Sequence, residues 1–440
     1  MTGRTAIVLF TRDLRVHDHP ALTASCAAFD RVVPLYVLDP ALARRSANRN
    51  RFLHQSLTAL RAALRGLGGD LVVRHGDPVA ETVRLAGEVG AEAVALSADV
   101  SRYAEQRAGR LRAECARHRL GLRFFPGLTV VDPGALRPTG GDHYRVFGPY
   151  HRAWTGQPWR AELAAPARVL LPAGVRAGRL PAQPGGESPE AAAGGEDEAR
   201  RRLDRWLPTA AGYGDRHDDM AGDATSRLSP YLRFGCLSPL TVASRVDDRL
   251  SPFVRQLCWR DFLYQVTAAF PEISVRAYRR GAVERWRHDD DARTAWEQGR
   301  TGVPIVDAGM RQLRAQGWLH NRARLITAGF LTKSLGLDWR AGLAGYARWL
   351  LDGDVANNAG NWQWVAGTGN DTRPYRGFNP VRQAERYDPD GAYVRRWVPE
   401  LVAVTGTAVH RPWRLPAALR QTLDYPPPLA PPDAEPVWLR

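Results

Sequence analysis

Several residue types are scarce in this 440-residue sequence, and each scarcity excludes a class of protein. It has only four cysteines, without any CxxC pair: Cys26, Cys115, Cys236 and Cys258. This spacing argues against a disulfide framework, a structural zinc site and an iron–sulfur cluster. No apolar run approaches the roughly 18 residues of a membrane span, and the run near the N-terminus is too short for a signal peptide. We therefore expect a soluble, cytoplasmic protein with reduced thiols.

Lysine is almost absent, and arginine supplies nearly all of the 61 basic residues. Against 46 acidic residues, the formal net charge is +15. The planar guanidinium group suits phosphate contacts, and a basic excess is typical of proteins that bind nucleic acid. A general bias toward Arg, Ala and Gly explains the same composition, so charge alone leaves this function open. The hydrophobic content of 44% is enough for a sizeable core.

The first 130 residues alternate between short apolar runs and longer segments with helical spacing. The apolar runs lie at residues 6–10, 32–38, 70–76, 91–97 and 122–127. Near-continuous apolar strands that alternate with helices indicate a parallel sheet covered on both faces. We therefore predict an α/β domain over residues 1–130, with a parallel, five-stranded, doubly wound sheet.

A polar motif, TRDLRVHDHP, follows the first predicted strand. No GxGxxG occurs there, which argues against a nicotinamide site of the Rossmann type. The motif places Arg12, Asp13, Arg15 and His17 at the carboxyl edge of the sheet. Doubly wound sheets bind ligands at this edge, so we expect these side chains to face a ligand.

The rest of the chain divides into a linker and a helical region. Residues 131–199 are predicted to be an interdomain linker, because the stretch 163–199 is rich in Ala, Pro and Gly and lacks an amphipathic pattern. From residue 200 to residue 440, apolar residues recur at three- and four-residue intervals. This periodicity predicts a large all-α domain.

Two polar clusters in the helical region each have two interpretations. Thr225, Ser226 and Ser229 precede an apolar helical run, where hydroxyls and backbone N–H groups can bind a phosphate or simply cap a helix. In RQLCWRDFLYQV, Gln256 shares a helix face with Trp259 and Arg260. An amide beside an indole suits a flat pocket for a base, and an amphipathic surface helix is the alternative.

In GWLHNRARLI, three polar residues recur at three-residue steps, which predicts that Trp318, Asn321 and Arg324 share a helix face. Arg324 is expected to pair with a carboxylate of Asp352 or Asp354. His320 has no second ligand at HxxxH spacing, so no metal site is predicted there.

The stretch DGDVANNAGNWQWVAGTGND, at 352–371, combines carboxylates, amides and indoles, and it is too polar for simple core packing. Trp362 and Trp364 lie two residues apart, so in a helix they point about 200° apart. The two indoles therefore face different surroundings.

Motifs along nearly the whole chain outside the linker resemble those of the DNA photolyase and cryptochrome family, most closely the bacterial class I cyclobutane pyrimidine dimer photolyases. They occur in the family's order: LFTRDLRVHDHPAL, TSRLSPYL, CWRDF, TGVPIVDAGMRQL, GWLHNRAR, LLDGD, NWQW and YDPDGAYVRRWVPEL. The resemblance implies an α/β domain followed by a large all-α FAD-binding domain. It also implies a light-driven lyase, in which excited reduced FAD lends an electron to a cyclobutane pyrimidine dimer in DNA, the ring splits and the electron returns.

The resemblance implies a U-shaped FAD inside the helical domain. The residues at matching positions are Tyr213, Thr225, Ser226, Arg227, Leu228, Ser229, Gln256, Arg260, Trp318, Asn321, Arg324, Asp352, Gly353, Asp354 and Asn358. Asn358 matches the residue that faces flavin N5. A neutral amide there tolerates the anionic reduced flavin that repair requires.

The resemblance also separates the tryptophans by role. Trp362, Trp339 and Trp286 match the first, second and third members of an electron-transfer chain from the flavin to the surface. With Asn358 and Gln256 they form the expected catalytic set. The expected DNA contacts are Gln256, Trp259, Asn321, Arg322, Leu325 and Trp364. Trp259 and Trp364 match aromatic walls for a dimer flipped out of the duplex.

Two positions and one segment depart from the family's patterns. Class I enzymes usually carry Glu where this chain has Gln256, and Met where it has Leu325. Gln is usual in the (6-4) branch, but that branch needs histidines at Asn321 and Leu325, and both are missing, so the dimer assignment is kept. The segment DVSRYAEQRAG lacks the Asn-Glu pair of folate-binding members, which leaves the second chromophore open between a folate, a deazaflavin and none.

Other functions remain as alternatives. A cryptochrome-type photoreceptor without repair activity commonly has a long C-terminal extension, whereas here only a short Pro-rich end follows the last motif. A flavoprotein of this fold with a different substrate is a further alternative. We expect a monomer whose partner is DNA that contains pyrimidine dimers and which associates with the nucleoid through DNA binding.

Overall fold

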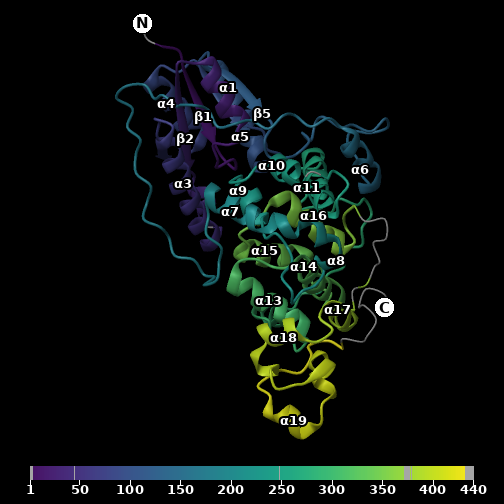
Figure 1. Cartoon of the computed structure of the whole chain (residues 1–440). Coiled ribbons are helices and arrows are strands. Elements are labelled where there is room, and N and C mark those ends of the chain that lie inside the picture. The colour runs from purple at the N-terminus through teal and green to yellow at the C-terminus, as the bar shows by residue number, and fades with distance from the viewer. Residues whose placement is uncertain (1–2, 44, 247, 371–376, 378, 432–440) are drawn as a thin grey trace. The chain divides into compact units, whose positions relative to one another are not determined.

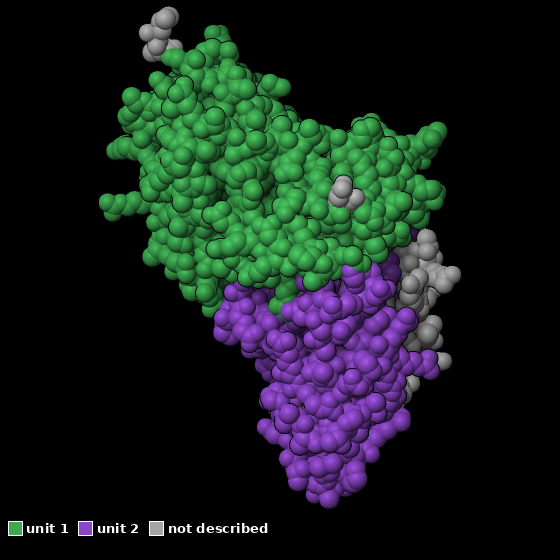
Figure 2. Space-filling view, in the orientation of Figure 1, with its two compact units in different colours: residues 1–186, 193–211, 226–272 green, residues 187–192, 212–225, 273–440 purple. Residues whose placement is uncertain are grey.

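The computed structural model describes residues 3–43, 45–246, 248–370, 377 and 379–431. By its contacts, the chain forms two compact units, which Figure 2 shows in green and purple. Unit 1 comprises residues 1–186, 193–211 and 226–272, and unit 2 comprises residues 187–192, 212–225 and 273–440. The predicted division at residues 130 and 199 cuts the chain differently and stays a prediction. No helix in the described ranges is long and apolar enough to cross a membrane.

Unit 1 is built around a parallel sheet of five strands in the order β3-β2-β1-β4-β5 (Figure 1). The strands are β1 (Thr5–Phe10), β2 (Arg31–Leu38), β3 (Val72–His75), β4 (Ala93–Ser97) and β5 (Gly121–Phe125). Every residue of β1, the central strand, is buried. The chain winds outward from β1 to β3 and then returns to β4, which is the doubly wound order. The predicted α/β sheet is therefore confirmed.

Helices make up the remainder of both units. Those of unit 1 are α1 (Pro20–Ala28), α2 (Pro40–Ala43), α3 (Ala47–Gly66), α4 (Pro78–Val89), α5 (Arg102–Arg117), α6 (Phe147–Gly156), α7 (Glu196–Trp206), α9 (Ser229–Phe234), α10 (Pro239–Val246) and α11 (Pro252–Ala269). Those of unit 2 are α8 (Tyr213–Arg216), α12 (Asp290–Gln298), α13 (Pro304–Gln316), α14 (Asn321–Gly329), the π-helical turn η2 (Phe330–Ser334), α15 (Trp339–Trp349), α16 (Val355–Ala366), α17 (Pro380–Tyr387), α18 (Ala392–Trp397) and α19 (Ala417–Thr422). The predicted helix-rich remainder of the chain is confirmed.

The predicted linker contains structure of its own. Helix α6 lies within it, and its buried residues Phe147, Tyr150 and Trp154 recur at helical spacing. Further along, the backbone N–H of Val32 donates to Leu170 O, and that of Val73 donates to Ala177 O, both at 2.8 Å. These bonds hold the Pro-rich stretch against β2 and β3. Because β3 is an edge strand, the stretch covers backbone groups that would otherwise be unpaired.

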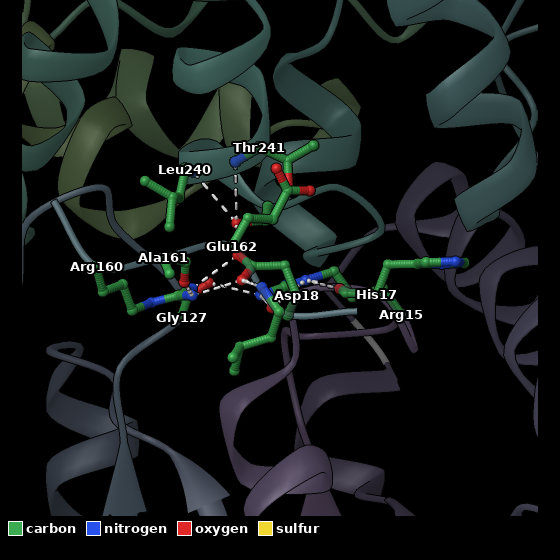
Figure 3. A network of polar contacts seen from close by, with 11 residues as sticks. Arg15, His17, Asp18, Gly127, Arg160, Ala161, Glu162, Leu240 and Thr241 are labelled. Atoms are coloured by element: carbon green, nitrogen blue, oxygen red, sulfur yellow. Dashed lines mark hydrogen bonds and ion pairs between the residues drawn. The ribbon is translucent and has the colours of Figure 1, made fainter. Parts of the chain in front are cut away.

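The polar motif after β1 forms a buried network in place of the predicted ligand site (Figure 3). Arg15 is only 1% exposed. Its guanidinium donates to the carbonyls of Asp18 (2.8 Å), Gly127 (2.9 Å) and Gly235 (3.0 Å). The Asp18 carboxylate in turn accepts from Arg160 Nη2 at 2.7 Å and from Ser238 Oγ. A charge taken out of water must find such partners, so Arg15 has a structural role.

The neighbouring motif residues are also paired within unit 1. Asp13 Oδ2 accepts from Ser97 Oγ at 2.6 Å and lies 3.1 Å from His19 Nε2. Despite its burial, these partners lower the pKa of Asp13 to about 2. Arg12 pairs with Asp99 at 3.3 Å, and His17 Nδ1 pairs with Glu196 at 2.8 Å. These side chains lie after β1 as expected, but their polar atoms join loops of the protein itself, so the expected contact with a ligand has no support from the structure.

A second buried carboxylate, that of Asp261, connects α11 to α6 and to the loop before it. Its Oδ2 accepts from the backbone N–H groups of Val130 (2.9 Å) and Val131 (3.0 Å) and from Trp154 Nε1 (3.0 Å). Burial outweighs these bonds and raises the pKa of Asp261 to about 6. The folded protein therefore binds this proton more tightly than the unfolded chain does.

Asp261→Asn should reduce the pH dependence of stability between pH 4.5 and 7.5. A raised carboxyl pKa means that this group's contribution to the free energy of unfolding falls as pH rises from about 4 to 6. The neutral amide keeps an oxygen for the three donors and does not titrate. The free energy of unfolding of the variant minus that of wild type should therefore rise by about 2 kcal/mol from pH 4.5 to pH 7.5. Denaturant unfolding at each pH measures both values. Asp261→Leu, which lacks an acceptor, should be less stable at every pH. Parallel pH profiles for wild type and Asp261→Asn would contradict this assignment.

Candidate functional site

An ion pair in unit 2 joins α14 to the loop before α16. Arg324 Nη2 donates to Asp352 Oδ2 at 2.7 Å, and Arg324 Nε donates to Leu319 O at 2.9 Å. The predicted pairing of Arg324 is thus confirmed for Asp352. The second carboxylate oxygen, Asp352 Oδ1, is buried and has no hydrogen-bond partner within the described residues. Buried acceptors are rarely left unsatisfied, so this oxygen suits an N–H or O–H donor of a ligand.

Asp354 has a different task, because it caps α16. It accepts from the backbone N–H of Asn357 at 2.9 Å and from the Asn357 amide at 3.0 Å. Gly353 separates it from Asp352 and is half-buried. The helix that begins at this cap carries Asn358, whose half-buried side chain makes no hydrogen bond with the described part of the chain. An amide without internal partners is available to a ligand.

Three tryptophans of unit 2 belong to its helical core or pack against it. Trp362 on α16 is 2% exposed and Trp339 at the start of α15 is fully buried. Gly342 permits the close packing of these helices, since a Cβ atom there would lie 2.1 Å from the Trp362 ring. The half-buried Trp286 precedes Arg287, whose backbone N–H donates to Gly336 O at 2.8 Å, near Trp339. The indole N–H groups of all three tryptophans lack a hydrogen-bond acceptor among the described residues.

The predicted helix face shared by Trp318, Asn321 and Arg324 is wrong. Gly317, with a φ of 59°, ends α13, and α14 begins only at Asn321. His320 caps α14 through Nδ1, which accepts from the backbone N–H of Arg322 at 3.1 Å. Trp318 therefore precedes the helix, where it is 8% exposed, whereas Asn321 is exposed.

Two further predicted residues in unit 2 differ in availability. The guanidinium of Arg322 already pairs with Asp218 at 2.5 Å and lies 4.1 Å from the centroid of Tyr387, so it is not a free phosphate contact. The Thr225 hydroxyl is buried and has no partner among the described residues, as expected of a ligand donor. Leu325 and Trp364 are half-buried against the helical core, and Tyr213 begins α8 with its ring stacked on His217.

The loop that follows Thr225 belongs to unit 1. Arg227 adopts a left-handed backbone conformation, with a φ of 51°, and the N–H of Leu228 donates to Ser226 Oγ at 3.4 Å. Ser229 is the first residue of α9, and Leu228 precedes it without a side-chain cap. The predicted helix start is thus present.

Helix α11 carries the remaining predicted residues. Gln256 is exposed, as a substrate contact requires. Trp259 is half-buried and stacks face to face on Phe147 of α6, with ring centroids 3.6 Å apart. Arg260 donates to Leu128 O at 2.5 Å and to the Tyr264 hydroxyl at 3.0 Å, so these donors are used within unit 1. Sequence reasoning missed Phe147, because it lies in the predicted linker and only the fold brings it to Trp259.

A cavity of about 480 Å³ lies at the carboxyl ends of β2 and β3. Its lining includes Asp39 after β2, Asp77 after β3, and Tyr103, Arg107 and Arg110 of α5. Arg110 forms two 2.8 Å bonds with Asp77, and Tyr103 donates to Asp39. Arg107 Nε is buried and has no partner among the described residues. The sequence relates the segment 99–109 to a second chromophore, whereas the contribution of β2 and β3 emerges only from the fold.

Two family models match this chain, one in its N-terminal part and one in its C-terminal part. Residues 6–168 match the family described as DNA photolyase, and residues 253–435 match the FAD binding domain of DNA photolyase. A Streptomyces griseus protein named deoxyribodipyrimidine photo-lyase is 48% identical, with 96% of each chain covered.

Two solved structures are similar over almost the whole chain. A bacterial class III photolyase from Agrobacterium tumefaciens has a TM-score of 0.92 and 34% identity, and 98% of this chain and 95% of that one are covered. An archaeal photolyase from Sulfolobus tokodaii with two FAD molecules has a TM-score of 0.85 and 28% identity, and 97% and 96% are covered. Together with the family matches, these similarities show that the chain belongs to the DNA photolyase family and is an FAD-dependent enzyme of that family.

Proposed function

We propose that this enzyme uses light to split cyclobutane pyrimidine dimers in DNA. The observation that carries the proposal is the buried Asp352, whose Oδ1 lacks a partner among the described residues while Oδ2 is fixed by Arg324. A flavin ring offers an N–H donor for such an oxygen, and the buried Thr225 hydroxyl suits a phosphate or ribityl oxygen. The donor and acceptor set of unit 2 therefore fits FAD. When bound, reduced FAD supplies the electron that opens the dimer.

The surrounding residues have the properties that this chemistry needs. The Asn358 amide donates or accepts a hydrogen bond without a change of charge, so it tolerates an anionic ring beside it. Trp362, Trp339 and Trp286 offer oxidisable rings from the core toward the surface of unit 2. Their indole N–H groups have no acceptor in the described residues, so no side chain there takes up a proton when a ring is oxidised.

DNA recognition draws on different properties. An excess of arginine supports sequence-independent phosphate binding, which weakens as salt rises. A lesion must leave the base stack to reach a flavin, and an exposed amide beside a half-buried indole suits the flipped base. Gln256 and Trp259 of α11 supply this pair.

The cavity at the ends of β2 and β3 is the proposed site of a second chromophore. Its volume lies within the range of about 300–1,000 Å³ that is usual for small-molecule sites. The Sulfolobus protein carries two FAD molecules, so a second chromophore is known in a similar structure. Arg107, with its unpaired Nε, suits an anionic or carbonyl oxygen of the ligand, and both a folate and a deazaflavin carry such groups.

Arg107→Leu tests this second site. The variant removes the unpaired donor from the cavity, so the content of any second chromophore should fall several-fold while FAD content stays at the wild-type level. The measurement is the absorbance and mass of chromophores released from protein purified with each candidate present. Equal second-chromophore content in both proteins would place that ligand elsewhere.

Trp362→Phe tests the route by which FAD becomes reduced. Phenylalanine is much harder to oxidise than tryptophan, so light-driven reduction of oxidised FAD should slow greatly, as followed by flavin absorbance. Chemically reduced variant should still repair DNA, which serves as its control. Unchanged photoreduction would show that the electron enters by another path.

A light-dependent repair assay with a Gln256 series tests the main proposal. Wild-type enzyme with fully reduced FAD should split dimers in an oligonucleotide only under blue light. Gln256→Glu should keep or raise the yield, because it restores the usual class I residue. Gln256→Leu should lower the yield, since a buried thymine carbonyl loses a partner at about 1–3 kcal/mol. If wild-type protein splits no dimers, whether or not it responds to (6-4) lesions, the proposal fails and a photoreceptor or another lesion becomes the better assignment.

A further inference from the structure

Phe147 and Trp259 form a close, parallel, face-to-face stack. The ring centroids lie 3.6 Å apart and the planes differ by only 5°. Aromatic pairs in proteins usually prefer offset or edge-to-face contacts with centroids 4.5–7 Å apart. Phe147 is 7% exposed, whereas Trp259 is half-buried. The phenylalanine is thus the covered ring and the tryptophan the more open one.

A third ring fixes the orientation of this pair. Phe262 of α11 lies perpendicular to both rings, at 84° to Phe147 and 89° to Trp259, with centroids 5.8 and 5.6 Å away. Phe147 and Phe262 are the aromatic rings that contact Trp259 among the described residues. One face of the indole is therefore occupied by Phe147, and no ring of the described chain occupies the other.

The helix that supplies Phe147 is itself firmly attached. Trp154, on the same helix α6, is fully buried and donates through Nε1 to Asp261 Oδ2 on α11. Arg255 of α11 also lies with its guanidinium carbon 5.0 Å from the Phe147 centroid. The position of the Phe147 ring is consequently set from both helices and does not depend on Trp259 alone.

We infer that Phe147 is a positioning residue for lesion recognition, because it holds the Trp259 indole in place for a flipped base to stack on its other face. The inference rests on the proposed function. A half-buried indole without this neighbour would sample other rotamers, and binding would have to restrict it. With Phe147 in place, this ordering occurs on folding, so more of the stacking energy remains for the DNA.

The test compares substitutions that separate stacking from space filling. Phe147→Leu keeps an apolar side chain but removes the flat ring, and Phe147→Tyr keeps the ring as the matched control. Binding is measured at one salt concentration with a duplex that contains a cyclobutane dimer and with the same duplex undamaged. FAD content and thermal unfolding are recorded for each protein, so that misfolded variants are recognised.

Phe147→Leu should lower the preference for damaged DNA by roughly 2- to 12-fold, the factor that corresponds to ordering one side chain on binding. Phe147→Tyr should retain the wild-type preference, and binding to undamaged duplex should not change. In a Trp259→Ala background, Phe147→Leu should have no further effect. This coupling distinguishes positioning of Trp259 from a general loss of packing.

The outcomes distinguish failure of the inference from failure of the proposed function. If Trp259→Ala lowers the preference but Phe147→Leu does not, or if the two effects simply add, Phe147 has no positioning role and the proposed function stands. If wild-type protein does not prefer damaged DNA, or Trp259→Ala is neutral, lesion recognition by this surface is wrong and the inference falls with it.

Discussion

The buried guanidinium of Arg15 is the constraint on which the arrangement of unit 1 depends. A cation with 1% exposure needs acceptors within the protein, and the carbonyls of Asp18, Gly127 and Gly235 supply them. These carbonyls come from three separate loops, so their conformations are fixed together. Removal of the cation would leave several buried acceptors without donors, which costs more than the loss of one contact.

This network also determines where the sheet can bind a ligand. The carboxyl end of β1, where doubly wound folds often place a ligand, is filled by Arg15, Asp13 and their partners. The open space lies instead at the ends of β2 and β3, where Asp39, Asp77 and α5 enclose a cavity. The charged motif after β1 thus fills the edge of the sheet at β1, while the edge at β2 and β3 stays open.

The sequence predicted features that depend on local pattern. The five strands followed from apolar runs, and the helix-rich remainder followed from the three- and four-residue recurrence of apolar residues after residue 200. The pairing of Arg324 with Asp352 was one of two alternatives, and only the fold decides between them, because Asp354 is used as the cap of α16. The prediction for Trp318 was wrong because Gly317 ends α13 and α14 begins only at Asn321. Residues 318–320 therefore lie between the two helices.

Other features could not be predicted because they depend on contacts between distant segments. Arg260 and Arg322 have the charge of ligand contacts, but their neighbours in space, Leu128 and Asp218, already accept from them. Phe147 lies more than a hundred residues from Trp259, in a stretch whose composition suggested a linker. The composition of residues 131–199 is an average over the whole stretch, so it does not reveal that the Phe147 ring packs on α11.

Gly342 affects the proposed electron transfer in unit 2 as well as the packing of its helices. Its missing side chain lets α15 approach the Trp362 ring, and any Cβ atom there would lie 2.1 Å from that ring and 2.6 Å from Leu331. Electron tunnelling decays exponentially with the distance between donor and acceptor. On the proposed route, a methyl group at position 342 would force α15, which begins with Trp339, away from the Trp362 ring. The absence of one carbon atom would then set an electron-transfer rate as well as a helix spacing.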